Sequence, residues 1–195
     1  MDIVTASQII GGNPEGKRSE KDFYPTPQEV TEALLRFLRL PAGTIIWEPA
    51  AGEGDMAAVF KKHGFSVIET DIQTGTDFLT ADAPGPFDWI ITNPPFCASE
   101  QFIKRCMELN KPFALLLKSQ YWHAAKRADL FYKLPPAYVL PLTWRPDFLF
   151  KQQGRHGAPL MDVMWCVWDP LMPYGCGKTE FYPLRKPAFN AERKL

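Results

Sequence analysis

The sequence predicts an α/β fold in which helices cover both faces of a mostly parallel sheet. Short apolar runs typical of strands alternate along the chain with segments whose apolar residues recur at helical spacing. Residues 44–69 contain a strand pattern, a glycine-containing turn, a helix pattern and a second strand pattern, which make one βαβ unit. Such alternation is typical of parallel sheets whose strands are joined by helical crossovers.

The elements follow one another in a regular order. The first helix is predicted over residues 27–40, where Thr26 and Pro27 suit the N-cap and the first helical position. The later elements are predicted as strand 44–47, helix 55–63, strand 66–69, strand 87–92, helix 99–109, strand 113–117, helix 121–133, an apolar run over 137–142 and strand 160–168. No helix separates the last two strands, and this predicts an antiparallel hairpin at one edge of the sheet.

The chain of 195 residues fits one domain with a sizeable core. Residues 1–22 are polar, contain Gly11-Gly12 and Asn13-Pro14, and are predicted to be a flexible lead-in. The folded domain is predicted over residues 23–170. Residues 171–195 are rich in proline and basic side chains and are predicted to pack on the domain as a tail.

Composition argues against several classes of protein. The chain is 46% hydrophobic and 23% charged, and no apolar run reaches the roughly 20 residues that a membrane helix needs. The first residues lack the pattern of a signal peptide, so a cytoplasmic protein without a membrane partner is expected. The four cysteines form no CxxC pair and the three histidines are scattered, so neither a metal site nor a disulfide framework is expected.

The net charge of zero conceals an asymmetry between the halves of the chain. Residues 1–100 carry 7 Lys and Arg against 15 Asp and Glu, and residues 101–195 carry 15 against 7. A basic excess of this kind is found on polyanion-binding faces. A mixed surface, on which the charges interleave after folding, is an equally good interpretation.

The turn after the first strand has the composition of a ligand-binding loop. It reads Glu48-Pro49-Ala50-Ala51-Gly52-Glu53-Gly54, and its small residues let the backbone approach a ligand closely. The spacing differs from the GxGxxG of dinucleotide sites, and its carboxylates would repel a pyrophosphate, so a ligand with a cationic amino-acid end suits it better. Asp71, after the second strand, is placed to hydrogen-bond ribose hydroxyls. A plain βα turn is the alternative interpretation.

The end of the strand over 87–92 carries the most specific signal. It continues into Asn93-Pro94-Pro95-Phe96, where two prolines stop the strand and leave carbonyl oxygens as acceptors without competing N–H donors. Asn93 adds a side-chain carbonyl, and Phe96 adds a ring for stacking. Together these groups can accept hydrogen bonds from an NH2 group and stack on the planar system that bears it.

These motifs resemble those of the amino-group DNA methyltransferases, which have an Asp/Asn/Ser-Pro-Pro-Tyr/Phe catalytic motif. Residues 93–96 match that motif, and residues 48–54 are similar to the family's first cofactor motif. Asp71 is similar to its ribose-binding acid, and Asp77-Phe78 to the motif that holds the cofactor's adenine. Residues 23–27 are similar to the segment that packs over the cofactor's methionine end. The resemblance covers about residues 22–120 and is close to the small adenine methyltransferases of phages and prophages.

The resemblance implies a Rossmann-like fold with a seven-stranded sheet and S-adenosylmethionine as cofactor. It implies methyl transfer to the N6 amine of a flipped adenine in DNA, in the cytoplasm of a bacterial host. The catalytic residues it implies are Asn93, Pro94, Pro95 and Phe96. The cofactor-binding residues it implies are Tyr24, Thr26, Pro27, Glu48, Pro49, Ala50, Gly52, Gly54, Asp71, Asp77, Phe78 and Asn93.

No separate target-recognition domain is expected after the residues that resemble the catalytic core. The loop over 143–159 is therefore the candidate for reading the substrate, since Arg and Gln suit base edges and Lys and Arg suit phosphates. Its candidate contacts are Arg145, Lys151, Gln152, Arg155 and His156. A solvated surface loop is the alternative. The sequence does not indicate an oligomeric state.

Four other functions share parts of this pattern. Enzymes that methylate the side-chain amide of glutamine in release factors use a similar Asn-Pro-Pro-Tyr motif, and the N4 amine of cytosine or an adenine in RNA would also suit the site. A catalytically silent nucleic-acid-binding subunit would retain the fold alone. The presence of Phe96 rather than Tyr, and of Tyr24-Pro25-Thr26-Pro27, favours the DNA enzymes over the glutamine enzymes.

Overall fold

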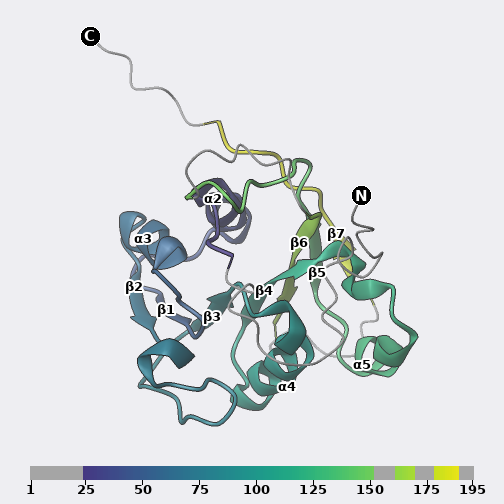
Figure 1. Ribbon diagram of the computed structural model, residues 1–195, viewed down its shortest axis with the longest axis horizontal. Helices are drawn as coiled ribbons and strands as arrows, with labels where there is room; N and C mark the ends of the chain where they lie inside the picture. The colour runs from purple at the N-terminus through teal and green to yellow at the C-terminus, as the bar shows by residue number, and fades with distance from the viewer. Residues whose placement is uncertain (1–23, 152–160, 170–177, 189–195) are drawn as a thin grey trace, which may run out of the picture.

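The computed structural model describes residues 24–151, 161–169 and 178–188, which form a seven-stranded sheet covered by helices. Its strands are β1 (Ile45–Glu48), β2 (Ser66–Glu69), β3 (Trp89–Thr92), β4 (Phe113–Lys118), β5 (Tyr138–Pro141), β6 (Val163–Trp168) and β7 (Glu180–Phe181). Across the sheet they lie in the order β2-β1-β3-β4-β6-β5-β7 (Figure 1). The α/β fold class predicted from the sequence and the seven strands implied by the resemblance are confirmed.

The sheet is parallel except at one strand. β1 pairs in parallel with both β2 and β3, and β3 pairs in parallel with β4. β6 runs antiparallel to β4 on one side and to β5 on the other, and these two strands are the predicted antiparallel pair. The strand order switches at β1, because the crossover from β1 leads to β2 on one side of it and the next crossover leads to β3 on its other side. Ligands bind at such a switch point in open α/β sheets.

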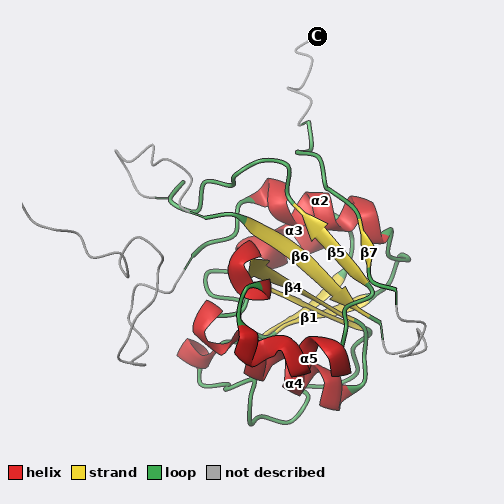
Figure 2. Ribbon diagram, turned by 90° about the vertical axis from the view of Figure 1, so that its right-hand side faces the viewer, coloured by secondary structure: helices red, strands yellow, loops and turns green. Residues whose placement is uncertain are grey.

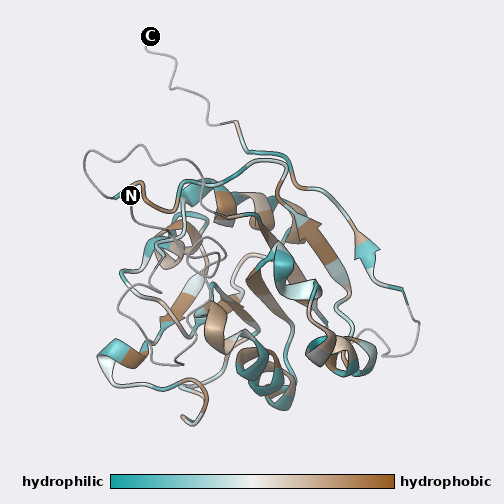
Figure 3. Ribbon diagram, turned by 45° about the vertical axis from the view of Figure 1, so that its right-hand side comes forward, coloured by the Kyte–Doolittle hydropathy of each residue, from teal (hydrophilic) through white to brown (hydrophobic). Residues whose placement is uncertain are grey.

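Helices cover both faces of the sheet (Figure 2). α2 (Gln28–Leu38) and α3 (Asp55–Lys62) lie on one face, and α4 (Ser99–Leu109) and α5 (Ala128–Lys133) on the other. β4 divides its apolar residues between the two cores. Ala114 and Leu116 join the core under α2 and α3, whereas Phe113, Leu115 and Leu117 join the core over α4. β4 is thus covered on both faces and can be apolar throughout, and Figure 3 shows hydrophobic colours along the central strands.

The helix predicted over 121–133 is broken into three short pieces. The chain forms two 3-10 turns, η4 (Ser119–Trp122) and η5 (Ala125–Arg127), before α5 begins at Ala128. The Arg127 guanidinium donates to the Tyr121 carbonyl (2.9 Å), and the Trp122 and Phe131 rings stack with centroids 4.0 Å apart. These contacts fold the segment back on itself, so a continuous helix was a wrong prediction here.

The seventh strand lies in a segment for which no strand was located from the sequence. β7 is two residues long and exposed, and it pairs in parallel with the edge of β5. Its position depends on pairing and on Leu184, which is buried, rather than on an apolar run. In the described part of the chain no helix has the length and apolar character needed to cross a membrane. Nor do three or more potential metal ligands come together among the described residues.

Candidate active site

A cavity of about 300 Å³ lies beyond the carboxyl ends of β1 and β3. This volume is within the usual range for small-molecule sites. Its lining includes these residues predicted from the sequence: Tyr24, Thr26, Glu48, Pro49, Ala50, Asp71, Asp77, Phe78, Asn93, Pro94, Pro95 and Phe96. Segments 15 or more residues apart in the chain therefore meet around one space, because parallel strands bring their carboxyl ends to the same edge of the sheet.

Two predicted glycines shape the turn after β1 without lining the cavity. Gly54 has φ +81° at the start of α3, and its N–H donates to the Ala51 carbonyl (2.8 Å). A β-carbon on Gly54 would lie 3.1 Å from a carboxylate oxygen of Glu69. Gly52 donates its N–H to Asp71 Oδ2 (2.9 Å), which ties the turn to the end of β2. Both glycines act through the backbone of the turn.

Glu48 is a buried carboxylate with an uncompensated oxygen. Its side chain is 2% exposed, and Oε2 has no hydrogen-bond partner. Burial, aided by the nearby Glu69 carboxylate, raises the pKa of Glu48 well above its usual range. Glu69 is paired with Lys61, and Asp55 with Lys151. Of these three acids, Glu48 is the one without a basic partner, and a cationic ligand in the cavity would supply that partner.

Asp71 is the predicted ribose-binding acid. It is buried at the start of η2 (Ile72–Thr74), where Oδ1 accepts the Gln73 N–H (2.8 Å) and Oδ2 accepts the Gly52 N–H (2.9 Å). Each oxygen retains acceptor capacity, because a carboxylate offers about four lone pairs. The backbone bonds hold the carboxylate in one orientation at the wall of the cavity.

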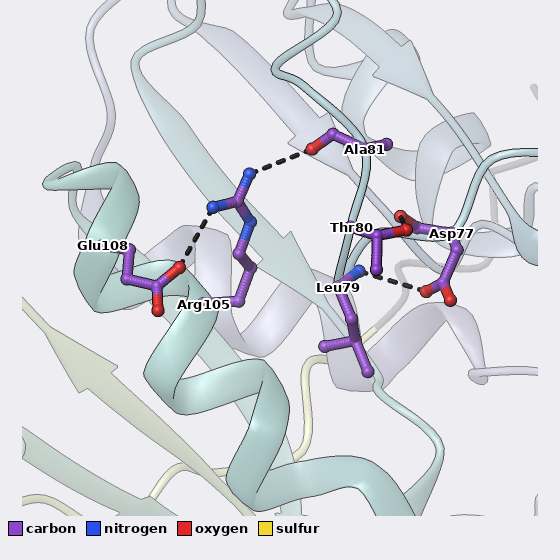
Figure 4. A network of polar contacts seen from close by, with 6 residues as sticks. All are labelled: Asp77, Leu79, Thr80, Ala81, Arg105 and Glu108. Carbon is purple, nitrogen blue, oxygen red and sulfur yellow. Dashed lines mark hydrogen bonds and ion pairs between the residues drawn. The ribbon is translucent and has the colours of Figure 1, made fainter.

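Asp77 and Phe78 begin a turn over residues 77–81, of which Figure 4 shows Asp77, Leu79, Thr80 and Ala81. Asp77 Oδ1 accepts the Leu79 N–H (3.1 Å), and the Ala81 N–H donates to the Asp77 carbonyl (2.8 Å). Phe78 is buried, and its ring packs against Phe102 of α4 with centroids 4.8 Å apart. The turn presents one acid and one aromatic ring to the cavity, which suits a purine.

Asn93 is held so that its acceptor oxygen has no partner of its own. The amide nitrogen donates to the Tyr24 carbonyl (3.2 Å) and to Thr26 Oγ1 (3.1 Å). These two bonds use both N–H groups and set the orientation of the amide. Oδ1 is buried and has no hydrogen-bond partner in the structure. Because an unpaired buried acceptor is costly, this oxygen is suited to a ligand that brings an N–H donor.

Phe96 lies next to Asn93 and has aromatic and cationic neighbours. Its ring centroid is 6.0 Å from that of Tyr24, and the Lys118 ammonium lies 4.6 Å from the ring centroid. The following residue, Cys97, also lines the cavity. Two other cysteines, Cys106 and Cys166, are fully buried, and burial raises the pKa of each thiol. Those two thiols are therefore poor nucleophiles.

Some lining residues were not among the site residues predicted from the sequence, although Pro25 and Ala51 lie within predicted motifs. They are Pro25, Ala51, Asp55, Met56, Ile72, Gln73, Thr76, Cys97 and Phe102. Most flank a predicted motif by one to three positions, so a wider window would have included them. Phe102 is different, because only its position on α4, facing the turn over 77–81, brings it to the cavity. Pro27, predicted as a cofactor contact, lies just before α2 and does not line the cavity.

The loop predicted to read the substrate is described only in part. Lys151 binds the carboxylates of Glu53 (2.7 Å) and Asp55 (2.6 Å) at the start of α3. Arg145 donates to Asp162 (2.8 Å). Phe148 is buried, with its ring centroid 6.2 Å from that of Tyr24. Gln152, Arg155 and His156, predicted as further substrate contacts, lie outside the described residues.

Solved structures share this fold. The methyltransferase subunit of a type I restriction-modification system from Streptococcus thermophilus matches with a TM-score of 0.57 and 14% identity over 75% of this chain. A candidate class I S-adenosylmethionine-dependent methyltransferase from Listeria monocytogenes matches with a TM-score of 0.56 and 14% identity over 90% of this chain. The M protein of the type I restriction enzyme EcoKI matches with a TM-score of 0.55 and 16% identity over 89% of this chain. No family model and no curated protein sequence matches.

These likenesses show a Rossmann-like class I methyltransferase fold, as predicted. The matches cover 44% of the Streptococcus subunit, 51% of the EcoKI subunit and 70% of the Listeria protein, so the chain spans about half the length of the restriction-system subunits. S-adenosylmethionine is the cofactor expected of the fold. The cavity fits it, because Glu48 offers an unpartnered carboxylate oxygen to a positive charge and the turn over 77–81 offers an acid and a ring to a purine.

Proposed function

We propose that the protein transfers the methyl group of S-adenosylmethionine to the exocyclic N6 amine of adenine in DNA. The observation that carries this proposal is the state of Asn93. Its N–H groups are used by Tyr24 and Thr26, and its buried carbonyl oxygen is left for a donor that the protein does not supply. An NH2 group on a planar acceptor is such a donor.

Two acceptors and one ring orient the amine. One N6 hydrogen donates to Asn93 Oδ1 and the other to the Pro94 carbonyl, which follows the strand without a competing N–H at Pro95. Phe96 stacks on the base. This geometry draws the nitrogen lone pair out of the plane of the ring and directs it toward the methyl group that the cofactor supplies. The residues contribute positioning and electrostatics, and the proton leaves to water after transfer.

The DNA assignment is supported by two features. Two of the structural neighbours are methyltransferase subunits of type I restriction systems. The second half of the chain carries the basic excess expected for a polyanion partner. In a duplex N6 is paired and shielded, so the target adenine must leave the stack before it reaches the cavity.

The experiment compares wild type, Asn93→Ala and Gln101→Ala with labelled S-adenosylmethionine and unmethylated duplex DNA, followed by nucleoside mass spectrometry. Gln101 is an exposed amide on α4 and serves as the matched control. We expect N6-methyladenine from wild type and Gln101→Ala, and a single-turnover rate lower by about a hundredfold or more for Asn93→Ala. Equal product from Asn93→Ala would contradict the role of Asn93. A different methylated nucleoside would contradict the choice of acceptor.

A further inference from the structure

The turn over residues 77–81 has little secondary structure around it. Between β2 and β3 the chain forms only the short η2, and residues 82–84 after the turn are exposed. Internal bonds from Asp77 close the turn, but they do not attach it to the rest of the molecule. Its attachment comes from Trp47 of β1, whose ring packs on that of Phe78 with centroids 5.2 Å apart, and from α4, whose Arg105 reaches Ala81 (Figure 4).

Two side chains one helical turn apart on α4 hold it. Phe102 packs on Phe78, and Arg105 donates from Nη2 to the Ala81 carbonyl (2.9 Å). The other arm of the guanidinium donates from Nη1 to Glu108 (3.0 Å). Arg105 is 22% exposed, and its Nε is buried without a partner. An arginine fork thus joins the end of the turn to the helix.

We propose that Arg105 is a positioning residue for the adenine of the cofactor, acting through the turn over 77–81. Phe102 lines the cavity and Arg105 does not, so Arg105 acts by holding the turn and not by contact. The inference rests on the proposed assignment of Asp77 and Phe78 to the adenine. It does not depend on which substrate accepts the methyl group.

The chemistry at the turn makes its position matter. The Leu79 N–H donates a hydrogen bond to Asp77 Oδ1. The carboxylate can accept further hydrogen bonds, and one of these is available to an exocyclic amine on the purine. A hypoxanthine ring carries a carbonyl oxygen at that position and would face the carboxylate with an acceptor. A fixed Asp77 therefore distinguishes adenine from hypoxanthine, and a turn released from α4 distinguishes them less well.

The test measures the affinity of S-adenosylhomocysteine and of S-inosylhomocysteine by calorimetry. Arg105→Lys and Arg105→Gln remove the fork, because neither side chain can reach both the Ala81 carbonyl and Glu108 in the geometry of a guanidinium. Glu108→Gln weakens the outer ion pair but leaves the bond to Ala81, and Lys104→Met changes an exposed neighbour on the same helix. Asp77→Asn tests the turn itself. Thermal melting confirms that each variant is folded.

We expect Arg105→Lys and Arg105→Gln to bind the adenosine compound about tenfold more weakly, with a smaller ratio between the two compounds. Glu108→Gln and Lys104→Met should retain the wild-type affinity for the adenosine compound and the wild-type ratio between the two compounds. An unchanged ratio in folded Arg105 variants, with a reduced ratio in Asp77→Asn, would overturn the role of Arg105 alone. An unchanged affinity ratio between the two compounds in Asp77→Asn would show that the turn does not bind the adenine. That result would also contradict the role proposed for Arg105.

Discussion

Two buried side-chain oxygens, Glu48 Oε2 and Asn93 Oδ1, lie at the same cavity without partners. Leaving such atoms unpaired costs stability in the unliganded protein, and a ligand with matching groups would remove that cost. One oxygen belongs to an acid and the other to a neutral amide. Their chemistry therefore differs, with Glu48 suited to a positive charge and Asn93 suited to an uncharged N–H donor.

Glu48 should make stability and cofactor affinity depend on pH in opposite directions. Its pKa is raised in the folded state, so the folded protein binds the proton more tightly than the unfolded chain. The free energy of unfolding therefore falls as the pH rises above the ordinary value of 4.5. Cofactor affinity should rise over the same range, because the carboxylate must lose its proton to pair with a cation.

Glu48→Gln should remove both dependences. At neutral pH we expect the unliganded variant to be more stable by roughly 1 kcal/mol, or about 2–4 °C in Tm, and to bind S-adenosylmethionine more weakly. Melting and calorimetry between pH 5 and 8 measure the two effects. Asp129→Asn, an exposed acid on α5, is the control. A variant that is less stable at neutral pH and has unchanged affinity would refute this interpretation of Glu48.

The turn between β1 and α3 depends on a glycine for two separate reasons. Gly54 has φ +81°, and a β-carbon there would crowd Glu69. Gly64 has nearly the same angle, φ +82°, with no atom within 4 Å of its β-carbon position. Substitution of either glycine adds the cost of left-handed backbone, about 1–2 kcal/mol. Only the substitution at Gly54 adds the contact with Glu69.

We therefore expect Gly54→Ala to lower the free energy of unfolding more than Gly64→Ala, measured by urea unfolding. We also expect only Gly54→Ala to weaken cofactor binding, since the turn it supports lines the cavity. Equal losses of stability and equal affinities for the two variants would show that the space beside Glu69 has no effect.

Lys151 connects the segment after β5 to the start of α3 through Glu53 and Asp55. Its ammonium is thus engaged on the protein rather than presented to a phosphate. We expect Lys151→Met to cost less than about 1 kcal/mol of stability, because the pair is partly exposed. We also expect an unchanged slope of log Kd for DNA against log salt concentration. A slope smaller by about one would instead assign Lys151 to a phosphate contact.

The elements that were predicted well are those whose signal is local. The apolar run 113–117 predicts β4, and the turn at Gly54 predicts the start of α3. Both elements are found at these positions in the structure. β7 has no such signal, because a two-residue strand is defined by its pairing with β5. The break in the helix over 121–133 follows from contacts of Arg127 and Trp122 that depend on the folded neighbours.

The sheet assembles the site from segments far apart in the chain. Glu48, Asp71 and Asn93 meet at one cavity because the carboxyl ends of β1, β2 and β3 lie side by side, and Tyr24 joins them through its carbonyl, which accepts from the Asn93 amide. Motif order alone could predict that meeting. It could not predict that Asn93 donates to both Tyr24 and Thr26, or that Arg105 reaches Ala81 from α4, since both depend on side-chain geometry across layers.

One reaction mixture decides which amine the whole molecule methylates. Wild-type protein and labelled S-adenosylmethionine are incubated with equal concentrations of duplex DNA, an RNA of the same sequence and a glutamine-containing release-factor peptide, and the products are identified by mass spectrometry. We predict that the label enters DNA as N6-methyladenine and that the other acceptors remain unlabelled. Label in RNA or on the glutamine amide, with none in DNA, would contradict the proposed function while leaving the methyltransferase fold and its cofactor cavity in place.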